Sequence, residues 1–367
     1  MVTTIDRRRV LAYRAWAQGL HRDAAAAHEL EVLDLGVQDT PPGSASHALA
    51  IRTVATTADA AEGLVTTWSV RGAPHVHRDG DLVALSHALW PWSDADALAR
   101  LDTSSSPVRA SGLPAREALR LVADNIADIV TEPMAKGDVS TALTPRVPEA
   151  MTVDCRRCEA THIVETLFRS AVLPAGIVFD PDERVVTFVP VPGWPGIPDD
   201  AVGADRLMRS YLGLLGPAAP ADVAAFLGST RAEVEGRWPD GLVEVAVDDK
   251  VVWIPEASLD ALASPPDPPT VRMLPPSDPW LQARDRDVVV PDREHQKAIW
   301  PILGRPGVVL VRGDVAATWR SRKKGRRLEV TVTPFGRIAA SVRRGIADQA
   351  DLAAHTKGLT EATVTVA

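Results

Sequence analysis

The 367-residue sequence lacks any apolar run long enough to span a membrane, because its longest apolar stretches are broken by charge or proline. Its two cysteines are too few for a disulfide framework in a chain of this size. The basic residues Arg7, Arg8 and Arg9 are not followed by an apolar stretch, so we expect no signal peptide. These absences predict an intracellular, cytoplasmic protein without a membrane partner.

Common catalytic signatures are missing as well: the phosphate-binding loop, the glycine-rich dinucleotide turn, the zinc-protease helix and the nucleophile elbow. We therefore expect no cofactor. Hydrophobic residues make up 46% and charged residues 24%, the balance of a globular protein with two to four small domains at this length. A net charge of −8 argues against indiscriminate coating of DNA, although local clusters of charge matter more than the sum.

The clearest module lies at about 203–255, where three short helices are predicted to precede a β-hairpin. This is the element order of a winged helix. Asp248-Asp249 forms the two-residue turn of the hairpin. The predicted elements are helices 205–215, 220–228 and 230–237, then strands 242–247 and 250–254.

The same order recurs less sharply in two earlier stretches, without a fixed-period sequence repeat. In the second stretch we expect helices 113–130, 137–143 and 159–173, then strands 177–179 and 185–189. In the first stretch we expect helices 6–18, 24–33 and 44–51, then strands 64–70 and 75–77.

Proline-rich linkers at 190–198 and 264–269 separate these stretches from one another and from the C-terminal part. We therefore predict an α+β protein of three tandem winged-helix modules and a C-terminal mixed α/β unit with a basic β-hairpin. The predicted boundaries are 1–110, 111–200, 201–263 and 264–367.

The C-terminal unit contains a run of six basic residues without an acid, placed between strands 315–319 and 328–333. Such a run is either the solvated tip of a hairpin or a surface that contacts phosphate. The run consists of Arg320, Arg322, Lys323, Lys324, Arg326 and Arg327.

Three further motifs carry candidate chemistry. Cys155, Cys158 and His162 have the spacing of partial Zn²⁺ ligands, but no further cysteine supplies a fourth ligand, so we favour a pair of packed thiols and predict no metal. Gln38-Asp39-Thr40 could hold and polarise a water molecule, or could form a polar helix-to-loop cap. Between Arg71 and His77, Arg71 could grip phosphate and His75 could face a nucleic-acid backbone, or the segment is a turn with two exposed histidines.

Taken in order along the chain, several strings resemble the tandem winged-helix superfamily of bacterial DNA glycosylases, the AlkZ/YcaQ-like proteins. The resemblance spans nearly the whole chain, and its strings are individually undiagnostic. They are Leu35-Gly36-Val37-Gln38, Arg71-Gly72-Ala73-Pro74-His75, Tyr211-Leu212 through Gly216-Pro217-Ala218-Ala219-Pro220-Ala221-Asp222-Val223, Ser277-Asp278-Pro279-Trp280-Leu281 and, loosely, Leu303-Gly304-Arg305-Pro306-Gly307 through Trp319-Arg320.

The resemblance implies a monofunctional DNA glycosylase that hydrolyses the N-glycosidic bond of alkylated or crosslinked purines in double-stranded DNA. In that family a Gln-x-Gln or Gln-x-Asp motif positions the attacking water. Gln38 matches the first position, whereas Thr40 departs from the second, so Asp39 would have to supply the carboxylate. The resemblance also makes the basic hairpin a set of phosphate contacts.

Two other readings stay open. The altered motif is compatible with a DNA-binding regulator or lesion sensor without chemistry, and the net charge permits a scaffold that binds protein. In each case we expect a monomer.

Overall fold

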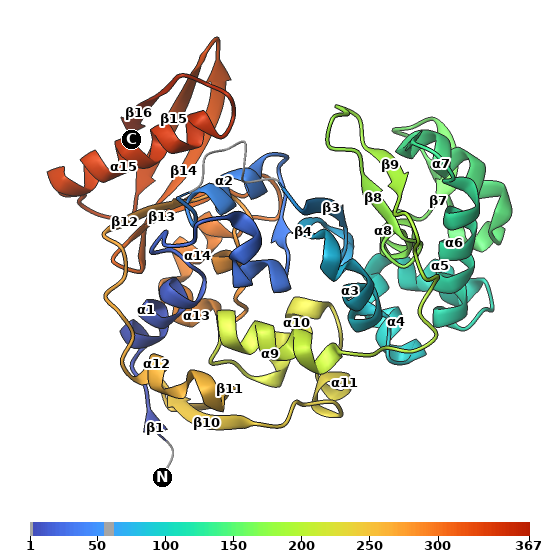
Figure 1. Cartoon of the computed structure of the whole chain (residues 1–367), viewed down its shortest axis with the longest axis horizontal. Coiled ribbons are helices and arrows are strands. Elements are labelled where there is room, and N and C mark those ends of the chain that lie inside the picture. Colours follow the sequence, from blue (N-terminus) through green and yellow to red (C-terminus); the bar gives the residue numbers. More distant parts are fainter. Residues whose placement is uncertain (1–2, 55–61) are drawn as a thin grey trace. The chain divides into compact units, whose positions relative to one another are not determined.

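A computed structural model describes residues 3–54 and 62–367. Residues 55–61, inside the first predicted module, and residues 1–2 lie outside the described residues. The chain is a mixed α+β protein that divides into two compact units (Figure 1). Unit 1 comprises Met1–Glu62, Arg209–Asp222 and Pro239–Ala367, and unit 2 comprises Gly63–Met208 and Val223–Trp238. Within the described ranges, no helix combines the length and apolarity needed to cross a bilayer.

Unit 1 is assembled from three separate stretches of the chain. Its helices are α1 (Arg7–Ala17), α2 (Ser44–Ala50), α12 (Leu259–Ala263), α13 (Arg286–Val289), α14 (Arg293–Ile299) and α15 (Ala340–His355). Its strands are β1 (Thr3–Thr4), β2 (Val37–Gln38), β10 (Leu242–Val247), β11 (Lys250–Pro255), β12 (Val271–Leu274), β13 (Gly307–Val311), β14 (Asp314–Lys324), β15 (Arg327–Pro334) and β16 (Glu361–Val366). The division between the units falls within α9 (Ala204–Leu215) and α10 (Pro220–Leu227).

The hairpin β10–β11 forms a small sheet in which β1 pairs in parallel with β10. Its turn is the predicted Asp248-Asp249, and both residues have positive φ angles, 48° and 62°. Two successive positive φ angles define the turn whose twist matches paired antiparallel strands. Ile5, Val10 and Tyr13 bury their side chains against this hairpin. The start of the chain is therefore part of the core around residues 242–255.

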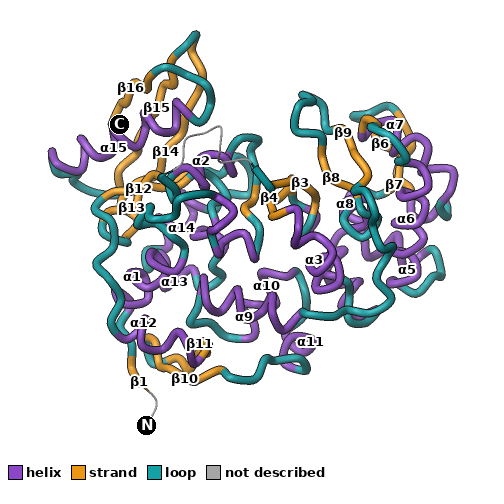
Figure 2. The backbone as a smooth tube through the Cα atoms, in the orientation of Figure 1, coloured by secondary structure: helices purple, strands orange, loops and turns teal. Residues whose placement is uncertain are grey.

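The largest sheet of unit 1 is C-terminal and has the strand order β12-β13-β14-β15-β16. Strands β12 to β15 are antiparallel neighbours, and α15 then returns the chain so that β16 lies parallel to β15. Figure 2 shows α15 beside this sheet. Because strand side chains alternate between faces, Trp319, Leu328 and Val330 pack with α15, whereas Arg320, Arg327 and Thr331 are exposed.

Unit 2 surrounds a separate core that includes Trp68, Trp90, Phe168 and Phe188. The amphipathic helix α6 packs against α8 in this core. The helices of the unit are α3 (Leu82–Leu89), α4 (Asp94–Leu101), α5 (Ser105–Ala110), α6 (Ala115–Ile129), α7 (Lys136–Leu143), α8 (Glu165–Val172) and α11 (Arg231–Glu235). The strands are β3 (Leu64–Trp68), β4 (Pro74–Arg78), β5 (Met134–Ala135), β6 (Thr152–Cys155), β7 (Ala160–Ile163), β8 (Ile177–Phe179) and β9 (Thr187–Pro190).

One predicted helix is wrong, and another begins later than predicted. Residues 24–33 contain only short 3₁₀ turns, Ala27–Glu29 and Glu31–Asp34, because Glu29 folds back to accept the N–H groups of Ala25 and Ala26 and Leu30 is extended. Residues 159–173 begin as strand β7, and only Glu165–Val172 is helical. The positive φ of Glu159 (52°) turns the chain back onto β6 before the helix begins.

Candidate functional site

Gln38 lies at the end of β2, and its side-chain amide is held by a residue 244 positions away. The Nε2 of Gln282 donates a hydrogen bond to Gln38 Oε1 at 3.1 Å. Gln282 also donates to the carbonyl oxygen of Ser277 at 3.3 Å. An amide oxygen has two lone pairs, so Gln38 Oε1 retains one acceptor site while its orientation is fixed. This geometry suits a residue that holds a water molecule.

The segment that supplies Gln282 is anchored by a buried ion pair. Asp278 accepts two hydrogen bonds from the guanidinium of Arg52, both at 2.8 Å, and both side chains are fully buried. Asp278 also accepts from the backbone N–H of Trp280 at 3.0 Å and so caps the 3₁₀ turn Pro279–Gln282. Paired, hydrogen-bonded charges are the form in which a protein core tolerates ionised groups. The turn that presents Gln282 is thus fixed from inside the core.

Asp39 and Thr40 differ in their surroundings. The Oδ1 of Asp39 accepts a hydrogen bond from the N–H of Ala45 at 2.9 Å, in the first turn of α2. Burial raises the pKa of Asp39 above its ordinary value, although hydrogen bonds from backbone N–H groups and the charge of Lys357 oppose the rise. Thr40 is exposed. Asp39 therefore binds a backbone N–H at the start of the following helix, rather than forming the helix-to-loop cap considered for this motif, and its raised pKa makes the carboxylate a stronger base than usual.

Helix α2 connects the Gln38 loop with the C-terminal sheet. His47 is buried, and one ring nitrogen, Nε2, lies 2.9 Å from the carbonyl oxygen of Met273 in β12. Its ring also meets Trp319 of β14 edge to face, with 5.9 Å between the centroids. Desolvation lowers the pKa of His47 to about 4, so the ring is neutral at physiological pH. His47, in the helix that follows the Gln38 loop, therefore packs directly against the strand that carries the basic residues.

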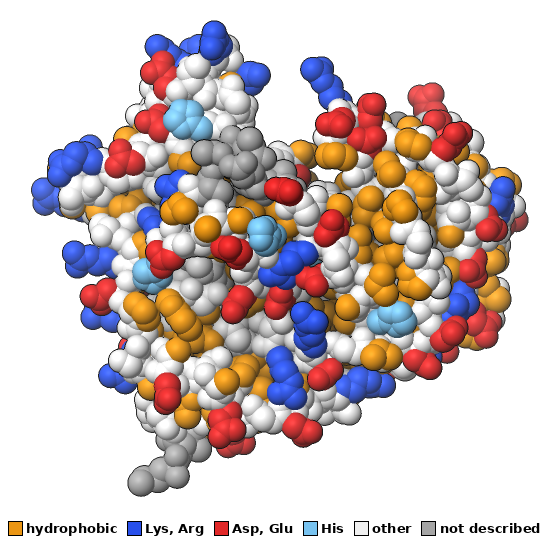
Figure 3. Space-filling model, in the orientation of Figure 1, with side chains coloured by type: hydrophobic (Ala, Val, Ile, Leu, Met, Phe, Trp, Pro, Cys, Tyr) orange, Lys and Arg blue, Asp and Glu red, His pale blue; other side chains and the backbone are white. Residues whose placement is uncertain are grey.

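The basic residues form the outer part of the β14–β15 hairpin. Lys324 pairs with Arg327, so the turn is Gly325-Arg326, and the predicted hairpin is confirmed. Arg320 and Arg322 lie within strand β14 rather than in a loop. Figure 3 shows Lys and Arg side chains at this end of the sheet.

Acidic side chains neutralise part of this basic hairpin. Glu329 contacts Arg322 at 2.6 Å and Lys324 at 2.9 Å, and Glu361 contacts Arg327 at 2.5 Å. In the part of the chain that the structure describes, Arg320, Lys323 and Arg326 form no ion pair. Because no ion pair neutralises the charge of these three exposed cations, they are the best placed of the hairpin's basic residues to bind a phosphate.

Arg71 and His75 lie in unit 2, in and after the turn between β3 and β4. Arg71 has a positive φ of 56°, donates from Nη1 to the carbonyl oxygen of Phe226, and places its guanidinium over the Phe226 ring. His75 and His77 are buried, so the alternative of two exposed histidines is wrong. Desolvation lowers the pKa of His75 to about 3, and its Nδ1 lies 2.9 Å from the carbonyl oxygen of Ala73.

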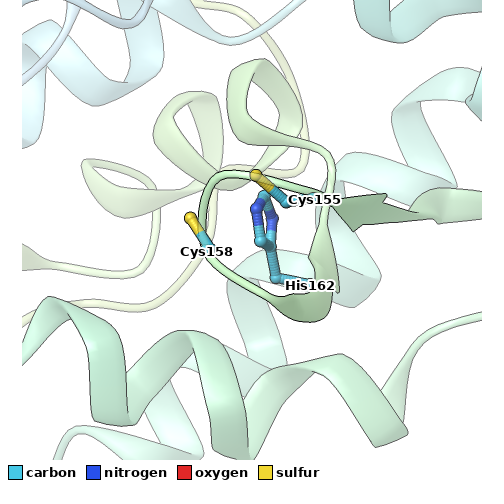
Figure 4. A group of neighbouring side chains, drawn as sticks. All are labelled: Cys155, Cys158 and His162. Carbon is cyan, nitrogen blue, oxygen red and sulfur yellow. The ribbon is translucent and has the colours of Figure 1, made fainter.

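Cys155, Cys158 and His162 come together in the β6–β7 hairpin of unit 2 (Figure 4). One potential ligand atom from each residue lies within 4.8 Å of the others. A side-chain hydrogen bond with His162 and backbone N–H groups directed at the sulfur lower the pKa of Cys155 to about 7. Hydrogen bonds with the Ile163 carbonyl oxygen and with Cys155 raise the pKa of His162.

The structure also brings in residues to which the sequence patterns assigned no role. Gln282 and the Arg52–Asp278 pair support the Gln38 loop, although Gln282 directly follows the resemblance string Ser277–Leu281. A polar residue at the end of a string shared with a family is a signal that could have pointed to Gln282. Arg52 has no local signal, because its partner lies 226 positions away.

Comparison with known proteins identifies the fold and the family of this chain. The structure is similar to that of the Streptomyces sahachiroi DNA glycosylase AlkZ, with a TM-score of 0.76, 21% sequence identity and coverage of 100% of both chains. This likeness establishes the fold. A family model described as DNA glycosylase AlkZ-like matches residues 32–356. The chain therefore belongs to the AlkZ-like DNA glycosylase family. No curated protein matches the sequence.

Proposed function

We propose that this protein binds duplex DNA and hydrolyses the N-glycosidic bond of bulky or alkylated purines. Membership of the AlkZ-like family supports the reaction class. The observation that carries the proposal is the 3.1 Å hydrogen bond from Gln282 to Gln38, because it fixes the amide oxygen of the residue that matches the first position of the family's water-binding motif. Pre-positioned polar groups of this kind lower the barrier without reorganising during the reaction.

In the proposed reaction the C1′–N bond breaks and its electron pair leaves with the base. Positive charge then develops on the sugar ring, and a water held by Gln38 attacks C1′. An alkylated purine that is cationic becomes neutral as it departs, so the demand on a general acid is small. The products are the free base and an abasic site with a hydroxyl at C1′.

Asp39 is the group we assign to take the proton from the attacking water. Burial raises its pKa, which makes its carboxylate a better proton acceptor. Its Oδ1 accepts from the Ala45 N–H, which aims the side chain. Thr40 stands where the family has an amide or a carboxylate, and we assign it at most a hydrogen bond to the water.

For DNA binding we propose three tandem winged-helix modules and the basic hairpin acting together. The order of three helices and a hairpin, α9 to β11, supports the module at 201–263. Exposed cations of the β14–β15 hairpin would contact phosphates, first among them Arg320, Lys323 and Arg326. Arg71 and His75 would support the turn of the first module. We propose that the protein acts as a cytoplasmic monomer.

A second candidate function, DNA binding without chemistry, is favoured by one observation. The Asp39 carboxylate already accepts a hydrogen bond from the first turn of α2, and Thr40 offers only a hydroxyl. In that case Gln38 would stabilise its loop and the hairpin would still bind DNA.

Single-turnover release of an N7-alkylated purine from duplex DNA separates the two functions. A glycosylase releases the free base and leaves abasic sites that alkali cleaves. A binding protein shows salt-sensitive affinity for the same duplex and no base release at enzyme excess, which would overturn the proposed reaction.

A further inference from the structure

The β6–β7 hairpin gathers the two cysteines of this chain and one histidine around a single point. The two strands are in register, with Cys155 opposite Ala160 and Val153 opposite His162. Cys158 lies in the connecting turn, where its N–H donates to the Cys155 carbonyl oxygen at 3.2 Å. The short turn thereby brings both sulfur atoms to the end of the hairpin (Figure 4).

The imidazole of His162 is also oriented as a ligand. Its Nδ1 lies 2.8 Å from the carbonyl oxygen of Ile163, to which it donates when the ring is neutral. This fixes the tautomer and places the free lone pair on Nε2. Histidines that bind metal ions commonly donate their other ring nitrogen to a carbonyl in this way.

We propose that Cys155, Cys158 and His162 bind one Zn²⁺ ion, with water as the fourth ligand. The three ligand atoms lie within 4.8 Å of one another, whereas atoms on a tetrahedral zinc lie roughly 3.5–3.8 Å apart. Shifts of about an ångström in these exposed or partly exposed side chains close that gap. Two sulfur ligands and one imidazole suit Zn²⁺ and exclude Mg²⁺ and Ca²⁺, which require oxygen ligands.

Two features of the site determine the access of solvent to the ion and the charge around it. Cys158 is exposed and Cys155 is partly exposed, so the ion is reachable from solvent and one coordination position stays open to water. Two thiolates cancel the charge of the ion, so the remaining charge of the turn comes from Arg156, Arg157 and Glu159. The ion would link the turn to β7, and the site is independent of the proposed glycosylase reaction.

Cobalt binding by the reduced, metal-free protein tests this site directly. Because Cys155 and Cys158 are the only cysteines in the chain, thiolate-to-cobalt charge-transfer absorption can arise only from them. We expect that absorption to saturate at one Co²⁺ per chain, together with visible bands typical of tetrahedral cobalt, and Zn²⁺ to displace the ion. Absence of these bands in fully reduced protein would overturn the proposal and leave an ordinary dithiol.

Single substitutions assign the ligands. Cys158→Ser should weaken the charge-transfer absorption and the zinc affinity together, and Cys155→Ser should do the same. His162→Asn should keep the thiolate absorption but lower the zinc affinity by at least about tenfold. The control His355→Asn changes an exposed histidine of unit 1 and should leave both unchanged. Unchanged zinc affinity in Cys155→Ser, with a native circular dichroism spectrum, would contradict the assignment.

Discussion

Gln282 donates its side-chain N–H to the amide oxygen of Gln38 at 3.1 Å, joining two residues that are 244 positions apart. Gln282 is buried and donates also to Ser277, whereas Gln38 is partly exposed. Gln282 thus fixes the orientation of the Gln38 amide, which we propose holds the attacking water. The candidate site of this AlkZ-like protein therefore consists of the Gln38 amide and the distant residue that orients it, not of the Gln38-Asp39-Thr40 motif alone.

Gln282→Met should slow base release while leaving DNA affinity unchanged. The methionine side chain fills similar space but donates no hydrogen bond, so the Gln38 amide loses its fixed orientation. A hydrogen bond of about 1 kcal/mol corresponds to a rate decrease of roughly fivefold to tenfold in single-turnover release. The measurement is the release rate at saturating protein.

Gln296→Met is the matched control for this change. Gln296 is another buried glutamine of unit 1, and it donates to Asp287 and to the Val290 carbonyl oxygen. Its replacement should lower stability without slowing release. Equal rates for Gln282→Met and the wild type would remove Gln282 from the site.

Asp278→Asn should destabilise unit 1 strongly. The change leaves the fully buried Arg52 guanidinium without a counter-charge, and breaking one side of a buried ion pair costs about 3–5 kcal/mol. Urea denaturation followed by tryptophan fluorescence measures this loss. Glu235→Gln, in the exposed pair with Arg231, should cost less than about 1 kcal/mol. Similar losses of unfolding free energy from both substitutions would show that the buried pair contributes no more to stability than the exposed pair.

Stability should decline as the pH falls from about 6.5 toward 4, partly through His47. Burial lowers the pKa of His47 to about 4, and nearby Lys357 and Arg52 lower it further against the charge of Asp278. The unfolded chain takes up this proton near pH 6.5, so below that pH the unfolded state binds more protons than the folded state. His47→Gln should make the decline of melting temperature with pH shallower, and His355→Gln should not. Parallel curves for wild type and His47→Gln would contradict the account.

Sequence patterns correctly predicted those helices, turns and strands that neighbouring residues determine. The α2 helix, the Asp248-Asp249 turn and the basic hairpin were predicted from residue pattern within a few positions of their observed bounds. The helix expected at 24–33 failed because alanine content alone does not outweigh the Glu29 side chain bonding back to the preceding N–H groups. The helix expected at 159–173 begins only at Glu165, because strand pairing with β6 determines the structure before it.

The candidate site could be predicted only in part, since its supports come from distant stretches of sequence. Gln38 and Asp39 stood out by resemblance to a family motif, but no pattern near them indicates Gln282 or the Arg52–Asp278 pair. The assembly of unit 1 from separate stretches of the chain could not be predicted from local sequence either. Arg14 binds the Gly216 carbonyl oxygen and Asp285, contacts that hold separated stretches in unit 1 and leave no periodic signal.

The basic hairpin should contribute to DNA affinity according to how its charges are paired. Lys323 is exposed and without an ion pair among the described residues, so Lys323→Ala should reduce the slope of log K against log salt by about one unit. Lys297→Ala, an exposed lysine of α14 paired with Glu294, should leave the slope unchanged.

Glu329→Gln should have the opposite effect on DNA affinity. Glu329 neutralises Arg322 and Lys324, and removing its charge frees both cations for phosphate. We expect tighter binding and a steeper salt dependence, measured by fluorescence anisotropy with duplex DNA. Weaker binding by Glu329→Gln would show that the ion pairs are needed to shape the hairpin rather than to screen it.

The central claim is that Gln38 positions the water that attacks C1′. The most direct test compares wild type and Gln38→Ala in single-turnover release of an N7-alkylated purine, with duplex binding measured for both so that equal occupancy is ensured. If Gln38 positions the water, the wild type releases the base, and at equal occupancy Gln38→Ala does not. Equal release rates for the two proteins would contradict it.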